Sequence, residues 1–192
     1  MSGERQVKVL YDERRIAERT EELAREIAAT KPKDLLVVAI LKGSFMFAAD
    51  LLRALHRAGL EPQVEFFHLS SYLSGTVSSG TVKILRDIES SIRDRDVLLV
   101  DDILESGRTL AFAKDLLVAR GARRVLVCTM LEKPGKRVVE IGADFVGFVC
   151  PDVFVVGYGM DVAHSYRELP FIGRVVTAED ADAVVPETAA RV

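Results

Sequence analysis

Apolar runs and helical repeats alternate along the chain, and this alternation predicts strands followed by helices. Between Asp12 and Ala29, apolar residues recur every three or four positions among Arg and Glu, as in a helix that buries one face. Residues 35–41 (LLVVAIL) are all apolar, which predicts a strand buried on both faces. Further strands are expected at 63–69, 82–85, 97–100, 125–131, 145–149 and 154–156, and further helices at 45–58 and 109–117. The order predicts an α/β fold with a mainly parallel sheet flanked by helices.

The segment 97–110 (VLLVDDILESGRTL) carries the clearest functional signal in the chain. A buried strand is expected to end at Asp101 and Asp102, and a turn with Ser106 and Gly107 leads into the next helix. Ligands of open α/β sheets bind beyond the carboxyl ends of the strands. Carboxylates accept hydrogen bonds from a sugar diol, and a small-residue turn at a helix N-terminus offers N–H groups to a phosphate. The segment therefore predicts a sugar phosphate as the ligand.

Composition narrows the class of protein. The 192 residues, 49% of them hydrophobic, suffice for a single domain over 1–192, with a core at about 10–175 and a loosely held tail at 177–192. The net charge of −3 and the scattered basic residues argue against nucleic acid as a partner. No apolar run reaches the roughly 18 residues of a membrane span, so no membrane partner is expected. Cys128 and Cys150 lie in apolar runs, which favours buried reduced thiols and a cytoplasmic location.

The pattern Asp-Asp-x-x-x-Ser-Gly-x-Thr at 101–109 resembles the phosphoribosyl-pyrophosphate motif of the type I phosphoribosyltransferases. Five other segments resemble the hypoxanthine–guanine branch of that family in the same order: 41–45 (LKGSF), 70–76 with 82–85, 131–134 (LEKP), 154–161 (FVVGYGMD) and 167–173. The resemblance covers most of residues 10–175. It implies the type I phosphoribosyltransferase fold with a small hood region, and a cis peptide between Leu41 and Lys42.

The resemblance also implies a reaction and a set of residues. A 5-phosphoribosyl group would move from phosphoribosyl pyrophosphate to N9 of hypoxanthine or guanine, giving IMP or GMP and pyrophosphate, with Mg²⁺ as cofactor in a homodimer or homotetramer. The implied residues are Asp101, Asp102, Ser106, Gly107, Arg108 and Thr109 for the sugar and its 5′-phosphate, Lys42, Gly43 and Arg167 for pyrophosphate, Lys133, Phe154, Val155 and Asp161 for the 6-oxopurine, Asp101 and Asp161 for the metal, Ser71 and Tyr72 for a mobile lid, and Glu105 for catalysis.

Glu105 is where the chain departs from the family pattern. The purine branch has Glu-Asp where this chain has Asp101-Asp102, and aspartate at the position of Glu105, where it handles the proton of purine N7. The longer side chain displaces its carboxylate by on the order of 1 Å, which matters for catalysis unless it is compensated. One more rotatable bond lets the side chain fold back at a cost below roughly 1 kcal/mol. We expect Glu105 to keep the acid/base role.

Two other classes of function remain open. One is a nucleotide-sensing regulator on the same fold that binds RNA with another face, against which the net charge of −3 counts. The other is an oxidoreductase or kinase-like nucleotide binder, but Gly157-x-Gly159 lacks a third glycine and no Gly-x4-Gly-Lys-Ser/Thr occurs. The sequence leaves open the choice between hypoxanthine, guanine and xanthine, and between dimer and tetramer.

Overall fold

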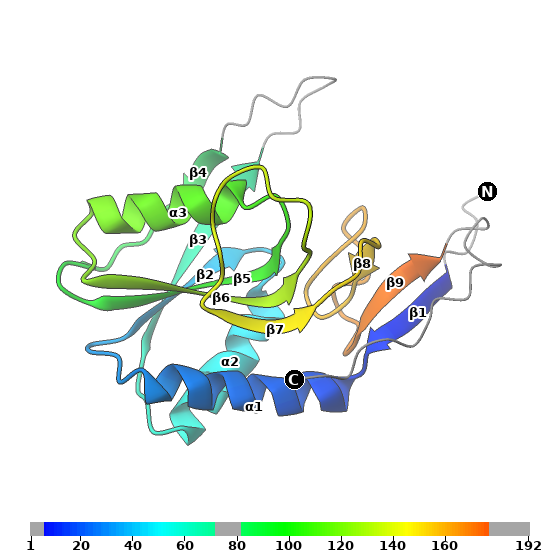
Figure 1. Cartoon of the computed structure of the whole chain (residues 1–192), viewed down its shortest axis with the longest axis horizontal. Coiled ribbons are helices and arrows are strands. Elements are labelled where there is room, and N and C mark those ends of the chain that lie inside the picture. Colours follow the sequence, from blue (N-terminus) through cyan, green and yellow to red (C-terminus); the bar gives the residue numbers. More distant parts are fainter. Residues whose placement is uncertain (1–5, 72–81, 177–192) are drawn as a thin grey trace.

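Two β-sheets and three helices make up the fold in this computed structural model, which describes residues 6–71 and 82–176 (Figure 1). The larger sheet has six strands in the order β4-β3-β2-β5-β6-β7, and the smaller has three in the order β1-β9-β8. The elements are β1 (Gln6–Tyr11), α1 (Glu13–Ala29), β2 (Leu36–Leu41), α2 (Phe45–Arg57), β3 (Gln63–Ser71), β4 (Val82–Arg86), β5 (Asp96–Leu104), α3 (Arg108–Ala119), β6 (Arg124–Glu132), β7 (Phe145–Val149), β8 (Val155–Val156) and β9 (Ile172–Val176).

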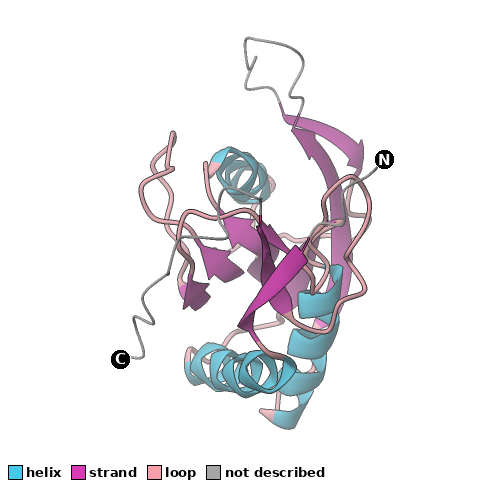
Figure 2. Cartoon of the chain, turned by 90° about the vertical axis from the view of Figure 1, so that its right-hand side faces the viewer, coloured by secondary structure: helices cyan, strands magenta, loops and turns pink. Residues whose placement is uncertain are grey.

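The large sheet confirms the predicted α/β architecture. Its neighbouring strands pair in parallel except β3 with β4, which pair antiparallel. Helices α1 and α2 cover one face and α3 covers the other, with the small sheet to one side as a hood (Figures 1 and 2). None of the described helices is long and apolar enough to span a membrane. The predicted tail at 177–192 and Tyr72 of the predicted lid lie outside the described residues.

Strand β5 shows why the central strands are continuously apolar. Leu98 and Val100 belong to the cluster under α1 and α2, whereas Val97 and Leu99 belong to the cluster under α3. All four are fully buried, because successive side chains of a strand point to opposite faces and both faces are covered. Each fully buried apolar side chain of this kind contributes about 1.5–3 kcal/mol. The sheet is therefore a rigid base for the loops at its carboxyl edge.

The boundaries of β5 differ from the expected 97–100. The strand continues through Asp101 and Asp102 to Leu104, because its pairing with β6 continues as far as Leu104 opposite Glu132. Its pairing with β2 stops earlier, at Val100 opposite Ala39. The two carboxylates thus lie inside the strand, just where it has lost one of its neighbours. One side of the acidic pair is consequently open to a ligand.

The sequence pattern also missed two strands. β1 and β9 pair antiparallel, Gln6 opposite Val176, and with β8 they form the hood sheet. The resemblance implies a hood, but the hydrophobic pattern of the sequence predicts no strand at either position. Their pattern is weak because β1 is mostly exposed, β9 has only five residues, and the two strands lie at opposite ends of the described chain. Cys128 and Cys150 are free and buried, as expected.

Candidate active site

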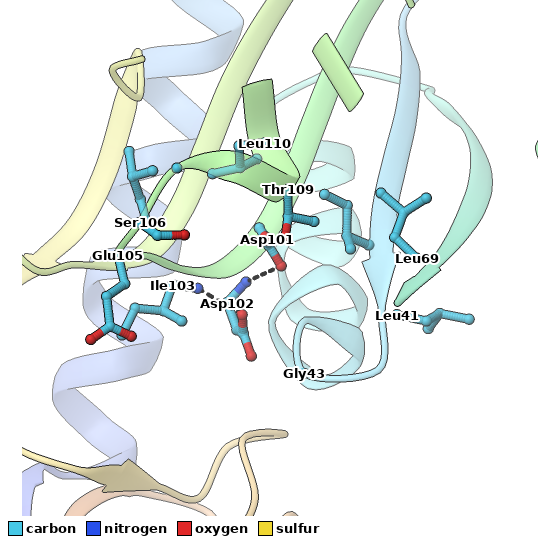
Figure 3. Close-up of a pocket in the computed structure, with 13 residues that line it drawn as sticks. Leu41, Gly43, Leu69, Asp101, Asp102, Ile103, Glu105, Ser106, Thr109 and Leu110 are labelled. Atoms are coloured by element: carbon cyan, nitrogen blue, oxygen red, sulfur yellow. Dashed lines mark hydrogen bonds between the residues drawn. The ribbon is translucent and has the colours of Figure 1, made fainter. Parts of the chain in front are cut away.

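A cavity of about 300 Å³ opens at the carboxyl ends of β2 and β5 (Figure 3). This is the edge at which open α/β sheets bind ligands. The cavity brings together Gly43 and the predicted residues of segment 101–109 except Arg108, whereas Lys42, Arg108, Lys133, Phe154, Val155, Asp161 and Arg167 do not line it. The lining residues are Ile40, Leu41, Gly43, Leu69, Asp101, Asp102, Ile103, Leu104, Glu105, Ser106, Gly107, Thr109 and Leu110.

Asp101 and Asp102 point to opposite sides of β5. Asp101 is only 8% exposed and lies beside Thr109, whereas Asp102 points to the opposite side of the strand (Figure 3). The Asp102 N–H donates to Asp101 Oδ1 at 3.0 Å, and the Ile103 N–H donates to Asp102 Oδ1 at 2.8 Å. Burial, and then the neighbouring charge of Asp102, raises the pKa of Asp101 well above its usual value. Burial also raises the pKa of Asp102, and Arg167 acts in the opposite direction. The pair therefore favours a cation or hydroxyl donors supplied by a ligand.

The turn between β5 and α3 is built around Gly107. Its φ of +81° lies in the left-handed region, and a Cβ there would sit 2.6 Å from Cγ2 of Ile141. Glycine is thus required by both backbone conformation and space. α3 begins at Arg108, and the N–H groups of a first helical turn have no partner within the helix. Ser106, Gly107 and Thr109 line the cavity next to these groups, which suits them to an anion.

Glu105 and Lys133 meet at the rim of the cavity. Lys133 follows β6, its side chain is 7% exposed, and its Nζ lies 3.5 Å from Glu105 Oε1. The Lys133 N–H donates to the Leu104 carbonyl at 3.0 Å, so the pairing of β5 with β6 brings the two residues together. The Glu105 side chain is 45% exposed. Its carboxylate points to the same side of β5 as Asp102, away from Leu110 (Figure 3).

The loop after β2 lies directly against the acidic pair. The Leu41–Lys42 peptide is cis, as the resemblance implies. A Cβ on Gly43 would sit 1.6 Å from Asp102 Oδ2, so only glycine lets the loop approach this closely. Ser44 is buried, and its hydroxyl donates to the Ile40 carbonyl. Lys42 is exposed beside the cavity. The loop thus places the backbone of Gly43 next to Asp102.

The hood contributes an arginine and an aspartate that contact each other. Arg167 Nη1 donates to the Gly159 carbonyl at 2.6 Å, and its Nη2 lies 2.6 Å from Asp161 Oδ1. Asp161 Oδ2 accepts the His164 N–H at 2.8 Å. A Cβ on Gly159 would sit 2.1 Å from the Gly43 carbonyl oxygen, which shows how closely the hood packs on the loop after β2.

The predicted base-binding residues differ in exposure. Phe154 is 56% exposed, so its ring is accessible from solvent. Val155 is 7% exposed and belongs to the core under α1 and α2. Neither residue lines the cavity itself.

Sequence reasoning missed two residues that hold the site together. The Tyr158 hydroxyl donates to Asp50 Oδ2 at 2.8 Å and joins the hood to α2. Arg137 contacts the backbone of the turn after β5. Tyr158 stands between two glycines in an apolar run and Arg137 beside another basic residue, so neither pattern signals a role.

Comparison with known proteins places these features in a family. The sequence model of one protein family, the phosphoribosyl transferase domain, matches residues 6–163 of this chain. The chain is 48% identical to the bifunctional protein TilS/HprT of Listeria monocytogenes over 86% of its own length, and spans about a quarter (25%) of that protein. It is 42% identical to the hypoxanthine phosphoribosyltransferase of Escherichia coli (strain K12), over 91% of this chain and 98% of that one. A solved hypoxanthine phosphoribosyltransferase from Staphylococcus aureus superposes with a TM-score of 0.83 at 40% identity, covering 88% of this chain and 91% of that one.

Proposed function

The chain belongs to the phosphoribosyl transferase domain family, and we propose that it transfers a 5-phosphoribosyl group from phosphoribosyl pyrophosphate to N9 of hypoxanthine and guanine. The products would be IMP or GMP and pyrophosphate. The observation that carries the proposal is the cavity in which an acidic pair, a phosphate-type turn and the Glu105–Lys133 pair share one edge of the sheet. The 42% identity to a hypoxanthine phosphoribosyltransferase along nearly all of that protein supports it.

The two ends of the sugar substrate match the two sides of the cavity. Ser106, Gly107, Arg108 and Thr109 would hold the 5′-phosphate with backbone N–H groups and hydroxyls, as helix N-termini do. Asp101 and Asp102 would orient the ribose hydroxyls as hydrogen-bond acceptors. On the other side of the cavity, pyrophosphate would be bound by Lys42, Gly43 and Arg167. The positive charges of Lys42 and Arg167 would stabilise the departing diphosphate as the bond from C1′ to its oxygen breaks and the bond to N9 forms.

The acidic pair fits a magnesium ion that arrives with the substrate. Within the described residues, no three His, Cys, Asp or Glu side chains are grouped closely enough to hold a metal by themselves. Mg²⁺ commonly uses one or two carboxylates together with substrate phosphates and water. Asp101 is the proposed direct ligand, and Asp161, already bound to Arg167 and His164, would act through water. When bound, the ion supplies positive charge against the diphosphate.

Base recognition follows from the Glu105–Lys133 pair. The ammonium of Lys133 only donates hydrogen bonds, so it suits the O6 acceptor of a 6-oxopurine. N7 neighbours O6 on the purine ring, and Glu105 lies 3.5 Å from Lys133, where it would hold or return the N7 proton. The exposed ring of Phe154 would offer a flat face to the base, and the buried Val155 would take part in the same subsite.

Several further features are proposed with this function. Ser71 ends β3, and the segment from Ser71 through Tyr72 would close over the reacting centre and exclude water. We also propose that the chain acts as one domain, as a homodimer or homotetramer, in the cytoplasm, without nucleic-acid or membrane partners. The comparisons give no support to the alternative of a nucleotide-sensing regulator.

A base-specificity assay tests the function directly. Hypoxanthine, guanine, xanthine and adenine are each incubated with phosphoribosyl pyrophosphate and Mg²⁺, and release of pyrophosphate is followed. Turnover is expected with hypoxanthine, and adenine should be rejected by as much as roughly 10⁴-fold because its amino group faces Lys133 with the wrong polarity. Comparable efficiency with adenine would contradict the role of Lys133, and no release with any base would contradict the function.

The acid/base role of Glu105 has its own test. Glu105→Gln keeps the shape of the side chain but cannot hold the proton, so kcat should fall by roughly 10²–10⁴ while the KM for phosphoribosyl pyrophosphate stays nearly constant. Glu140→Gln, on the exposed connection between β6 and β7, is the control and should leave kcat unchanged. Wild-type turnover in Glu105→Gln would show that another group handles the proton.

A further inference from the structure

The guanidinium of Arg137 lies behind the candidate site and binds the backbone where the chain leaves β5. Its Nη1 donates to the carbonyls of Leu104, at 2.9 Å, and Glu105, at 2.7 Å. Its Nε donates to the Ile141 carbonyl at 3.2 Å, and its Nη2 binds the carboxylate of Glu132. The side chain is 22% exposed. All three guanidinium nitrogens therefore have acceptors in the segments around the turn after β5.

The bonds to Leu104 and Glu105 fall at the end of the strand ladder. β5 ends at Leu104, so the Glu105 carbonyl is beyond the pairing with β6 and needs another donor. Arg137 supplies it through Nη1, which donates to two successive carbonyls while Nε and Nη2 hold the planar fork of the guanidinium on Ile141 and Glu132. The orientation of the Glu105 side chain depends on this peptide. Arg137 thereby fixes the residue that we propose as the acid/base.

The segment that carries Arg137 also forms the back wall of the phosphate turn. The Val138 N–H donates to the Ser106 carbonyl at 3.0 Å, and Ile141 and Val139 crowd the Cα of Gly107. Between this connection and α3 lies a cavity of about 730 Å³. In Figure 1 the connection is the yellow-green loop that rises from the sheet toward α3. Ile141 packs on the cluster under α3, and the hydrogen bonds of Arg137 add support where the cavity separates the loop from the helix.

The same guanidinium reaches the base-reading side. Glu132, which binds Arg137, immediately precedes Lys133. The Leu104 carbonyl accepts both the Lys133 N–H, at 3.0 Å, and Arg137 Nη1. Arg137 thus contacts the backbone of the acid and a neighbour of the lysine, and the residue after it, Val138, holds the phosphate turn.

We propose that Arg137 is a positioning residue that sets the placement of Glu105 relative to Lys133 and the phosphate turn, without touching the substrate. The proposal rests on the proposed function, because it assigns Arg137 a part in that reaction. A displacement of about 1 Å at a reacting group can cost on the order of 100-fold in rate. Arg137→Lys keeps the charge but removes the fork, so kcat should fall by roughly 10- to 100-fold, with a smaller rise in the KM for phosphoribosyl pyrophosphate.

Arg19 is a closely matched control. Its side chain is also 22% exposed, and it donates to the backbone carbonyls of Gly147 and Val146 and to two carboxylates, but it joins α1 to β7 away from the site. Arg19→Lys should lower the melting temperature to a similar extent as Arg137→Lys and leave kcat unchanged. Equal losses of kcat in the two variants would overturn the proposal.

A double-mutant cycle with Glu105 separates positioning from general support. If Arg137 acts through Glu105, then Arg137→Lys should cost little further kcat in a Glu105→Gln background, because the two losses are not independent. Additive losses would overturn the proposal. Should Arg137→Lys fail to fold, Glu132→Gln replaces it in the same cycle, since it removes one anchor of the guanidinium and leaves the fork intact. Wild-type protein without activity would refute the function, whereas active wild type with an unaffected Arg137→Lys would refute only the positioning role.

Discussion

The two sides of the candidate site are built in different ways. The side proposed for ribose and 5′-phosphate, from Asp101 to Thr109, is one continuous segment that runs from β5 into α3. The side proposed for pyrophosphate is assembled from the loop after β2 and the hood, whose Gly159 packs on Gly43. The first side inherits its geometry from a buried strand, whereas the second depends on contacts between distant segments. Substitutions on the two sides should therefore fail in different ways.

The largest loss of activity is expected from a substitution at Gly107, in the continuous segment. In Gly107→Ala, the new Cβ would have to adopt φ near +81° and clash with Ile141 at 2.6 Å, so the turn must shift. We expect kcat/KM for phosphoribosyl pyrophosphate to fall by on the order of 100-fold or more. Steady-state kinetics with varied phosphoribosyl pyrophosphate measure it.

Gly59 separates backbone strain from the clash at Gly107. It has a similar φ of +87°, but nothing lies within 4 Å of a Cβ placed there. Gly59→Ala should therefore cost about 1–2 kcal/mol of stability through its backbone alone and leave kcat/KM unchanged. A Gly107→Ala enzyme with wild-type kinetics would show that the turn adapts and that its shape does not set phosphate binding.

A smaller loss of substrate affinity is expected when the hydrogen bond that joins the hood to α2 is removed. Tyr158→Phe removes the hydrogen bond to Asp50, of 2.8 Å, that joins the hood to α2. A bond of this kind contributes about 0.5–1.5 kcal/mol, which corresponds to roughly 2–4 °C of melting temperature per kcal/mol in a chain of this size. The KM for phosphoribosyl pyrophosphate should rise roughly five-fold with kcat nearly unchanged, because the hood also holds Arg167 near Asp102. Kinetics and thermal melting of the same preparation report both.

Tyr11 provides the comparison at the opposite end of the hood. Its hydroxyl donates to the Val149 carbonyl at 3.0 Å and so ties β1 to β7. Tyr11→Phe should lower the melting temperature by a similar amount without changing KM. If both variants changed KM equally, the hood would act as one rigid unit rather than through the contact of Gly159 with Gly43.

The same contrast explains how far the sequence alone could lead. Asp101, Asp102 and Gly107 were predictable from physical chemistry, because strand, turn and helix follow one another within a single segment. The sequence around Arg167 is that of an ordinary surface arginine, and only the resemblance indicated a role in the site. Tyr158 and Arg137 were missed because their partners are fixed by tertiary packing: Tyr158 binds Asp50, 108 residues away, and Arg137 binds Leu104, 33 residues away.

An effect on stability that separates the two sides by its sign comes from replacing one aspartate on each side with asparagine. Burial and the neighbouring Asp102 raise the pKa of Asp101 in the folded protein above its unfolded value. Below about pH 4 this side chain is protonated in both states, and as the pH rises through the folded pKa the stability it contributes is lost. Asp101→Asn carries no such charge. It should melt higher than wild type near neutral pH, by on the order of 1 kcal/mol or roughly 2–4 °C, and the difference should vanish toward pH 4.

Asp161→Asn should shift stability the other way. Its carboxylate is bound by Arg167 at 2.6 Å and by the His164 N–H at 2.8 Å, so the charge is already compensated within the hood. Losing it leaves Arg167 without its partner and should lower the melting temperature at neutral pH by on the order of 1 kcal/mol. Thermal melts of the ligand-free proteins from pH 4 to 8 measure both signs. A lower melting temperature for Asp101→Asn at pH 7 would mean that the acidic pair is already neutralised inside the protein, and the carboxylates of the continuous side would then have no unmet demand for a cation.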